Sequence, residues 1–164
     1  MKISSVAIVI LLIGICSVFG QTNKSVSAKK TMKVAKGTFE VKITPLTAEE
    51  NVGDASIGRL ALEKTFAGDL VGTSKGQMLG IGTDIKESGG YVAAERLNVT
   101  LEGRKGTFAL QHSGTMQGGK FDLNVIVVPD SGTGDLVGIT GKLKIIIEKG
   151  NHFYELEYSL PEKK

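Results

Sequence analysis

Apolar and polar residues alternate along most of the chain from Gly37 onward. In the segment GTFEVKITP, Phe39, Val41 and Ile43 share one face, and the residues between them share the other. A period of two residues is typical of a strand with one buried face. Similar short segments follow at regular intervals. We predict further strands over residues 59–67, 69–74, 77–83, 91–101, 107–113, 121–128, 143–148 and 152–160.

Turn residues separate these segments, and no convincing amphipathic helix interrupts them. The chain has 22 glycines and 3 prolines, and glycine-rich turns recur at intervals suited to an antiparallel sheet. A single open sheet of eight or nine strands would expose long edges, which closure into a barrel removes. We therefore expect an all-β fold, a single antiparallel β-barrel of about eight strands over residues 37–164. A β-sandwich is the alternative.

The first residues resemble a secretory leader. Lys2 precedes an apolar run over residues 6–16, and Val18 and Gly20 are small enough for the −3 and −1 positions of a cleavage site. We predict a signal peptide over residues 1–20 and export to the periplasm or the exterior, with no membrane span left after cleavage. The alternative is an uncleaved leader that anchors the protein in a membrane. Residues 21–36 are polar and lysine-rich, which favours a flexible spacer.

Composition narrows the possible partners. The net charge is +3, and no basic cluster with interleaved aromatic residues is present, so we expect no nucleic-acid partner. The sole cysteine, Cys16, lies in the leader, and the two histidines are far apart in the pattern, so we predict neither a disulfide nor a metal site. We expect no cofactor, and homo-oligomers are possible because exposed strand edges can pair.

Residues 72–76 match the pattern G-x-S-x-G of a hydrolase nucleophile, with Ser74 at its centre. That motif needs a helix directly after the serine, and the residues that follow, QMLGIGT, are strand-like. We therefore interpret residues 73–76 as a hairpin turn and not as an active site.

Polar residues that interrupt the apolar faces are the candidates for function. Lys64 breaks the stripe of Leu60, Leu62 and Phe66, and each of the later strands shows similar interruptions. If these stripes line the barrel, the inward polar residues are Lys64, Glu95, His112, Tyr154, Tyr158 and, at the end of its strand, Gln77. An unpaired buried charge is costly, so we expect Lys64 and Glu95 to pair or to contact water.

Three functions are compatible with such a lumen. The first is binding of a small apolar or amphipathic molecule by these six residues. The second is a cofactor-free isomerase or cyclase in which Glu95, His112 and Tyr154 are the catalytic candidates. The third is a structural or interaction barrel whose core is filled by its own side chains.

Several segments together resemble a known bacterial family. The segments are TSKGQMLGIGT, GYVAAERL, FALQHSGTM, VVPDSGTGDLVGITGKLKI and HFYELEYSL, which occur in order between Gly37 and Leu160. They are similar to the domain-of-unknown-function family numbered thirty-two twenty-four. The resemblance implies an allene oxide cyclase-like barrel. Structural relatives of that barrel, the allene oxide cyclases and dirigent proteins, guide reactions of hydrophobic small molecules in a cavity, but a shared fold does not settle function.

Overall fold

The computed structural model describes residues 31–47 and 56–162, which form an all-β barrel. The predicted leader over residues 1–20 lies outside these residues. Strands of the described chain are long, and each shows the alternating burial expected of a barrel wall. They are β1 (Lys33–Pro45), β2 (Ile57–Gly68), β3 (Leu70–Gly82), β4 (Gly89–Leu101), β5 (Arg104–Gln117), β6 (Lys120–Val127), β7 (Thr140–Glu148) and β8 (Asn151–Ser159).

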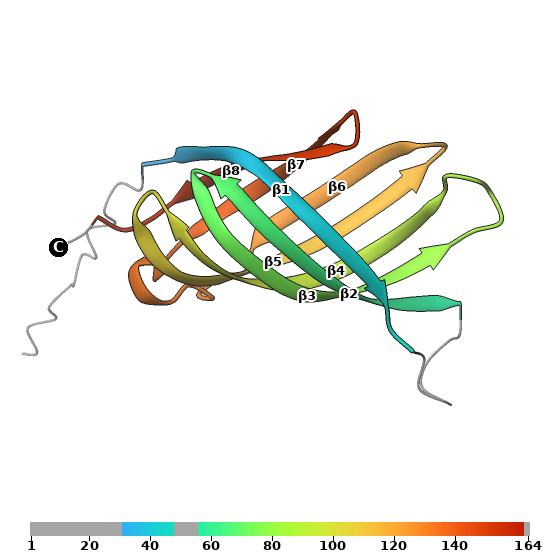
Figure 1. Cartoon of the computed structure of the whole chain (residues 1–164), viewed down its shortest axis with the longest axis horizontal. Helices are drawn as coiled ribbons and strands as arrows, with labels where there is room; N and C mark the ends of the chain where they lie inside the picture. Colours follow the sequence, from blue (N-terminus) through green and yellow to red (C-terminus); the bar gives the residue numbers. More distant parts are fainter. Residues whose placement is uncertain (1–30, 48–55, 163–164) are drawn as a thin grey trace, which may run out of the picture.

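Each strand pairs with its sequence neighbours in antiparallel register, and β1 pairs with β8 to close the barrel. The β1–β8 pairing ends at Phe39 and His152. Between β6 and β7 the register is reduced to one pair, Ile126 with Lys142. The strands on either side of these two seams therefore diverge toward one end of the barrel, as Figure 1 shows.

The two ends of the barrel differ. At one end lie the β2–β3 and β4–β5 turns, the β6–β7 connection and both ends of the described chain (Figure 1). The β6–β7 connection carries the short 3₁₀ helix Gly134–Leu136, and its Leu136 and Ile139 are fully buried. The opposite end carries the hairpin tips between β3 and β4, β5 and β6, and β7 and β8. We call the first the packed end and the second the mouth.

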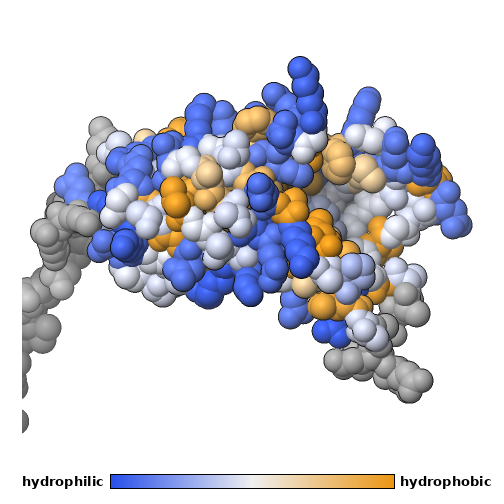
Figure 2. Space-filling model, in the orientation of Figure 1, coloured by the Kyte–Doolittle hydropathy of each residue, from blue (hydrophilic) through white to orange (hydrophobic). Residues whose placement is uncertain are grey.

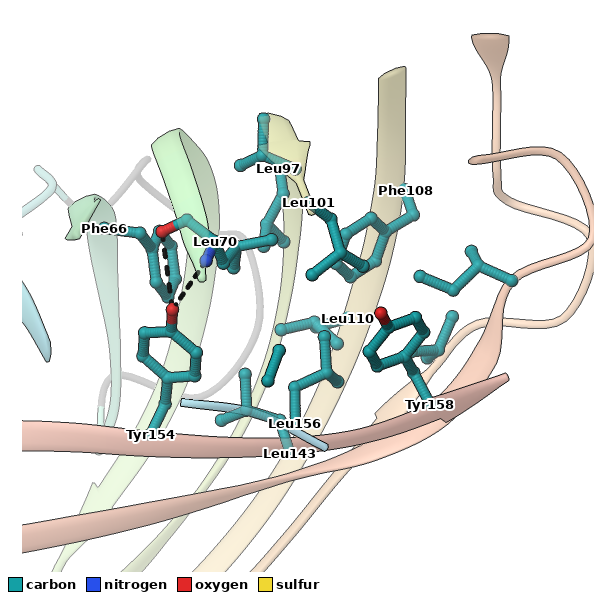
Figure 3. Packing of buried hydrophobic residues seen from close by; sticks show 14 of the residues in the cluster. Phe66, Leu70, Leu97, Leu101, Phe108, Leu110, Leu143, Tyr154, Leu156 and Tyr158 are labelled. Carbon is teal, nitrogen blue, oxygen red and sulfur yellow. Dashed lines mark hydrogen bonds between the residues drawn. The ribbon is translucent and has the colours of Figure 1, made fainter. Parts of the chain in front are cut away.

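An apolar core fills the half of the lumen next to the packed end (Figure 3). Tyr154 joins opposite sides of this half, because its hydroxyl accepts a hydrogen bond of 2.8 Å from the backbone N–H of the fully buried Leu70. Its ring packs edge-on against Phe66, with the ring centroids 5.7 Å apart. The core residues are Ala35, Phe39, Phe66, Leu70, Leu97, Val99, Leu101, Phe108, Leu110, Val125, Val127, Leu136, Ile139, Leu143, Tyr154, Leu156 and Tyr158.

The structure corrects two details of the strand prediction. Strand β1 begins at Lys33, and Ala35 belongs to the buried core, so the barrel includes residues 33–36 that we assigned to the spacer. Residues 73–76 do not form a hairpin turn, because β3 runs without interruption from Leu70 to Gly82. Its inward positions are mostly glycine and serine, so the segment lacked the apolar stripe that marks a strand.

Replacing Tyr154 with Phe tests the cross-lumen hydrogen bond. Tyr154→Phe leaves the Leu70 N–H buried without its acceptor, which we expect to lower the free energy of unfolding by about 1–3 kcal/mol. Urea unfolding measures the change. Thr38→Val, at an exposed position of β1, should change it by less than about 0.5 kcal/mol. Equal effects of the two substitutions would show that the hydroxyl makes no special contribution.

Candidate functional site

Four neighbouring strands bring polar side chains together inside the lumen. Lys64 of β2 is paired with Ser74 of β3, and Glu95 of β4 and His112 of β5 lie on the same inward face. All four residues are buried. We call Lys64, Ser74, Glu95 and His112 the polar cluster.

Glu95 is the centre of the polar cluster. Its Oε1 atom accepts a hydrogen bond from Lys64 Nζ at 2.7 Å, and its Oε2 atom accepts one from Ser74 Oγ at 2.5 Å. The His112 Nε2 atom lies 2.9 Å from the same Oε1. The Glu95 side chain is inaccessible to solvent, so these groups replace the water that a carboxylate needs.

The sequence around the cluster makes room for it. Gly76 lies directly opposite Glu95 in the β3–β4 register. A Cβ at this position would lie 2.3 Å from the Ala94 backbone oxygen and 2.6 Å from Glu95 Cβ, so only glycine fits. On the other side, Lys64 Nζ lies 5.1 Å from the centroid of the Phe39 ring, which adds a cation–π contact to the ion pair.

The surroundings of Glu95 hold its carboxyl in the ionised form. Burial alone would raise the pKa of Glu95, but contact with His112, the charge and hydrogen bond of Lys64 and the hydrogen bond from Ser74 outweigh it. Together they lower the pKa from 4.5 to about 2. A carboxylate with so low a pKa is a weak base at neutral pH.

His112 has unused hydrogen-bonding capacity. Its buried Nε2 atom has Glu95 Oε1 as a neighbour at 2.9 Å, but the alignment of this contact falls short of a well-formed hydrogen bond. Buried polar atoms in proteins nearly always have a partner, so an unsatisfied one is a sign of a site that a ligand or water completes.

A cavity of about 320 Å³ lies at the mouth, and its lining begins two residues beyond His112 of the polar cluster on β5. Figure 2 shows the hollow at this end of the molecule, with hydrophobic residues beside it. Its lining includes Leu60, Tyr91, Gly114, Met116 and Phe121. Gly114 is the next inward residue after His112 on β5, so the cavity floor meets the cluster.

Tyr91 forms part of that floor. A Cβ on Gly114 would lie 2.5 Å from Tyr91 Cε1, so the ring of Tyr91 lies across the bare backbone of Gly114. Burial, and then the nearby Glu95 carboxylate, raise the pKa of Tyr91, which keeps its hydroxyl protonated. Tyr91 is therefore available as a hydrogen-bond donor between the cavity and the cluster.

Large apolar side chains line the inner wall of the mouth and are left exposed. Ile43, Phe121 and Ile147 share the inward face with buried neighbours in the sheet register, yet they are 48, 60 and 50% exposed. Exposed apolar surface of this kind costs about 25 cal/mol for each Å² that water covers. A bound apolar molecule would remove part of that cost.

A second and larger hollow of about 490 Å³ lies outside the lumen. It runs over the outer wall of β2–β6 and includes Ile57, Leu79, Ile81 and Val92, whose side chains point away from the lumen. No residue of the polar cluster lines either hollow, and Tyr91 and Gly114 border both. The mouth cavity differs from this groove because the inward-facing Leu60, Met116 and Phe121 line it, so the mouth is the hollow that opens into the lumen.

The six predicted site residues fall into three groups. Lys64, Glu95 and His112 come together in the polar cluster. Tyr154 and Tyr158 are buried on the inward face but lie in the packed half, among the core residues (Figure 3). Gln77 is exposed on the outer wall, so its predicted inward position is wrong. It shares a face with Leu79 and Ile81, and both of these also point outward.

Sequence reasoning missed two residues of the site. Ser74 was read as part of a turn, yet it is buried and donates to Glu95. Counting every second residue from Leu70 would have placed it inward, beside Gly72 and Gly76. Tyr91 is the first residue of the predicted strand over residues 91–101 and is not among the sequence candidates, although a tyrosine at the start of a strand is well placed to face the mouth.

Within residues 31–47 and 56–162, no group of three or more His, Cys, Asp or Glu side chains could hold a metal ion. Over the same ranges, no helix has the length and apolarity required to cross a membrane.

Comparison with known proteins gives a family match and a structural match. The model of the family described as "Protein of unknown function (DUF3224)" matches residues 35–158. A crystal structure of a DUF3224-family protein with unknown function from Shewanella oneidensis MR-1 is similar to this chain, with 44% sequence identity and a TM-score of 0.73. The match covers 80% of this chain and 100% of that one. No curated protein matches the chain.

The low pKa of Glu95 predicts a loss of stability in acid. Its contribution is fully present above pH 4.5, the ordinary value, and is lost as the pH falls toward 2, because the folded protein resists protonation of this carboxyl. Urea unfolding between pH 2 and pH 6 measures the slope. Glu95→Gln should flatten the slope in this window relative to the wild type, and an unchanged slope would contradict the assignment.

A double-mutant cycle tests the buried ion pair. Lys64→Met leaves Glu95 without its cation, and we expect a cost of about 3–5 kcal/mol in the free energy of unfolding. Lys64→Met combined with Glu95→Gln should cost less than Lys64→Met alone. The exposed pair of Lys75 and Glu63, 3.3 Å apart, is the matched control, with an expected coupling below about 1 kcal/mol. Additive effects at the buried pair would exclude coupling.

Proposed function

This chain belongs to the DUF3224 family of proteins of unknown function, and from that premise we propose that it binds a small apolar or amphipathic molecule in the open half of its barrel. One observation carries the proposal. The apolar cavity at the mouth is lined by Tyr91 and Gly114, and Gly114 lies two residues beyond the buried His112 of the polar cluster on β5. Apolar walls with a few convergent polar groups are the usual composition of small-molecule sites.

The position of the ligand follows from this arrangement. Its apolar part would contact Leu60, Met116 and Phe121, whose surface is exposed or half-buried in the free protein. Its polar part would point down toward Tyr91 and His112. The packed half below, which is filled by its own side chains, supplies a rigid floor.

The other two functions have less support. A filled structural barrel fits the packed half but leaves the hollow mouth and its exposed inner wall without a role. An isomerase or cyclase needs a group that takes a proton near neutral pH, and the pKa of Glu95 near 2 makes that carboxylate a poor base. Tyr154, the third catalytic candidate, lies within the packed core and hydrogen-bonds the backbone at Leu70.

We also propose that the protein acts outside the cytoplasm. The support is the leader pattern of residues 1–20, with Lys2, an apolar run and a small-residue exit. A ligand that is sparingly soluble in water would suit an exported carrier.

Filling the cavity tests the binding function. Met116 is half-buried on the inner wall, and Met116→Trp should occupy the space and weaken binding of the apolar dye N-phenylnaphthylamine by about tenfold or more, equivalent to about 1.4 kcal/mol. Fluorescence titration measures the affinity. Leu79→Trp, on the outer groove, is the matched control and should leave the affinity within about twofold. If Leu79→Trp abolishes binding and Met116→Trp does not, the dye occupies the outer wall and the proposal fails.

A further inference from the structure

The charges inside the barrel restrict what kind of polar group a ligand can place there. Lys64 and Glu95 are in contact at 2.7 Å and are both buried, so the charges of this pair cancel. Within the described residues, the cavity lining contains no Lys, Arg, Asp or Glu side chain. The lumen therefore offers neither a spare cation for an acid nor a spare anion for an amine.

A charged group at the cavity floor would meet one member of the ion pair unfavourably. A carboxylate would lie close to Glu95, and an ammonium group would lie close to Lys64. Each would also lose part of its hydration on entering the cavity, and no charged group in the lining compensates this loss. The unfavourable charge contact and the lost hydration therefore both weaken the binding of a charged ligand.

A neutral oxygen has suitable partners at the same place. Tyr91 lines the cavity with a hydroxyl whose raised pKa keeps it protonated, and His112, two residues before the lining Gly114, has a buried Nε2 atom whose contact with Glu95 Oε1 is poorly aligned. A hydroxyl or carbonyl oxygen can accept from either residue without adding charge.

We propose that the lumen selects amphipathic molecules with a neutral oxygen head group, an alcohol or a ketone, over fatty acids and amines of the same length. This inference rests on the proposed binding function and names the ligand class. Lys64 and Glu95 determine the selectivity through their mutual neutralisation, while His112 and Tyr91 receive the head group.

The depth of the open half sets the size of suitable probes. From Glu95 to Gly89 at the rim, β4 advances six residues, which is about 20 Å at roughly 3.3 Å per residue. Strands tilted by about 40° to the axis reduce this to a depth of roughly 15 Å. A decyl chain has about this length.

Calorimetric titration of the full mature chain at pH 7 with decanol, methyl octyl ketone, decanoate and decylamine tests the inference. We expect the two neutral probes to bind at least about tenfold more tightly than either charged one. Equal or tighter binding of decanoate or decylamine would overturn the inference and leave the binding function intact. Failure of all four probes to bind would overturn the binding function and the inference with it.

Variants of the ion pair sharpen the test. Glu95→Gln leaves Lys64 unpaired and should shift the preference toward decanoate by about tenfold, whereas Lys64→Met should shift it toward decylamine. Lys75→Met removes one positive charge from the exposed outer wall and should keep the wild-type order. An unchanged order in both lumen variants would show that the pair does not set selectivity. Where a variant does not fold, the ranking of the wild type decides.

Discussion

The contact between Lys64 and Glu95 is the constraint on which the lumen depends. A carboxylate removed from water needs compensating partners, and here β2, β3 and β5 each supply one to Glu95 of β4. Shifting any of these strands by one residue would turn its polar group to the outer wall. The cluster therefore ties the register of four strands to a single buried charge.

The cluster also divides the barrel into two halves with different tasks. Below it, Tyr154 connects β8 to the start of β3, and Leu136 and Ile139 of the β6–β7 connection close the end. Above it, the strands diverge at the β1–β8 and β6–β7 seams and leave apolar side chains such as Phe121 exposed. A compact half that contributes most of the burial allows the other half to remain hollow.

Sequence reasoning succeeded where apolar neighbours mark a face. Leu62 and Phe66 surround Lys64, and Leu97 and Leu110 accompany Glu95 and His112, so the alternation alone placed these three residues inside.

Sequence reasoning failed on β3, where the inward residues are small because Glu95 and the adjacent backbone occupy the space, while Val71, Leu79 and Ile81 lie on the outer wall. A hydrophobic pattern marks an inward face only where the side chains are large and apolar, so it does not detect an inward face made of glycine and serine. Contacts between neighbouring strands, such as that of Tyr91 with Gly114, depend on a pairing register that no local pattern encodes.

The arrangement of the chain ends has a practical consequence. Lys33 pairs with Tyr158 at the packed end, so the described chain enters and leaves the barrel side by side, on the side away from the mouth (Figure 1). A purification tag, reporter domain or surface linker joined directly at Lys33 or Ser159 would start on the side away from the opening. Immobilised through these two points, the barrel would present its entrance to the surrounding solution.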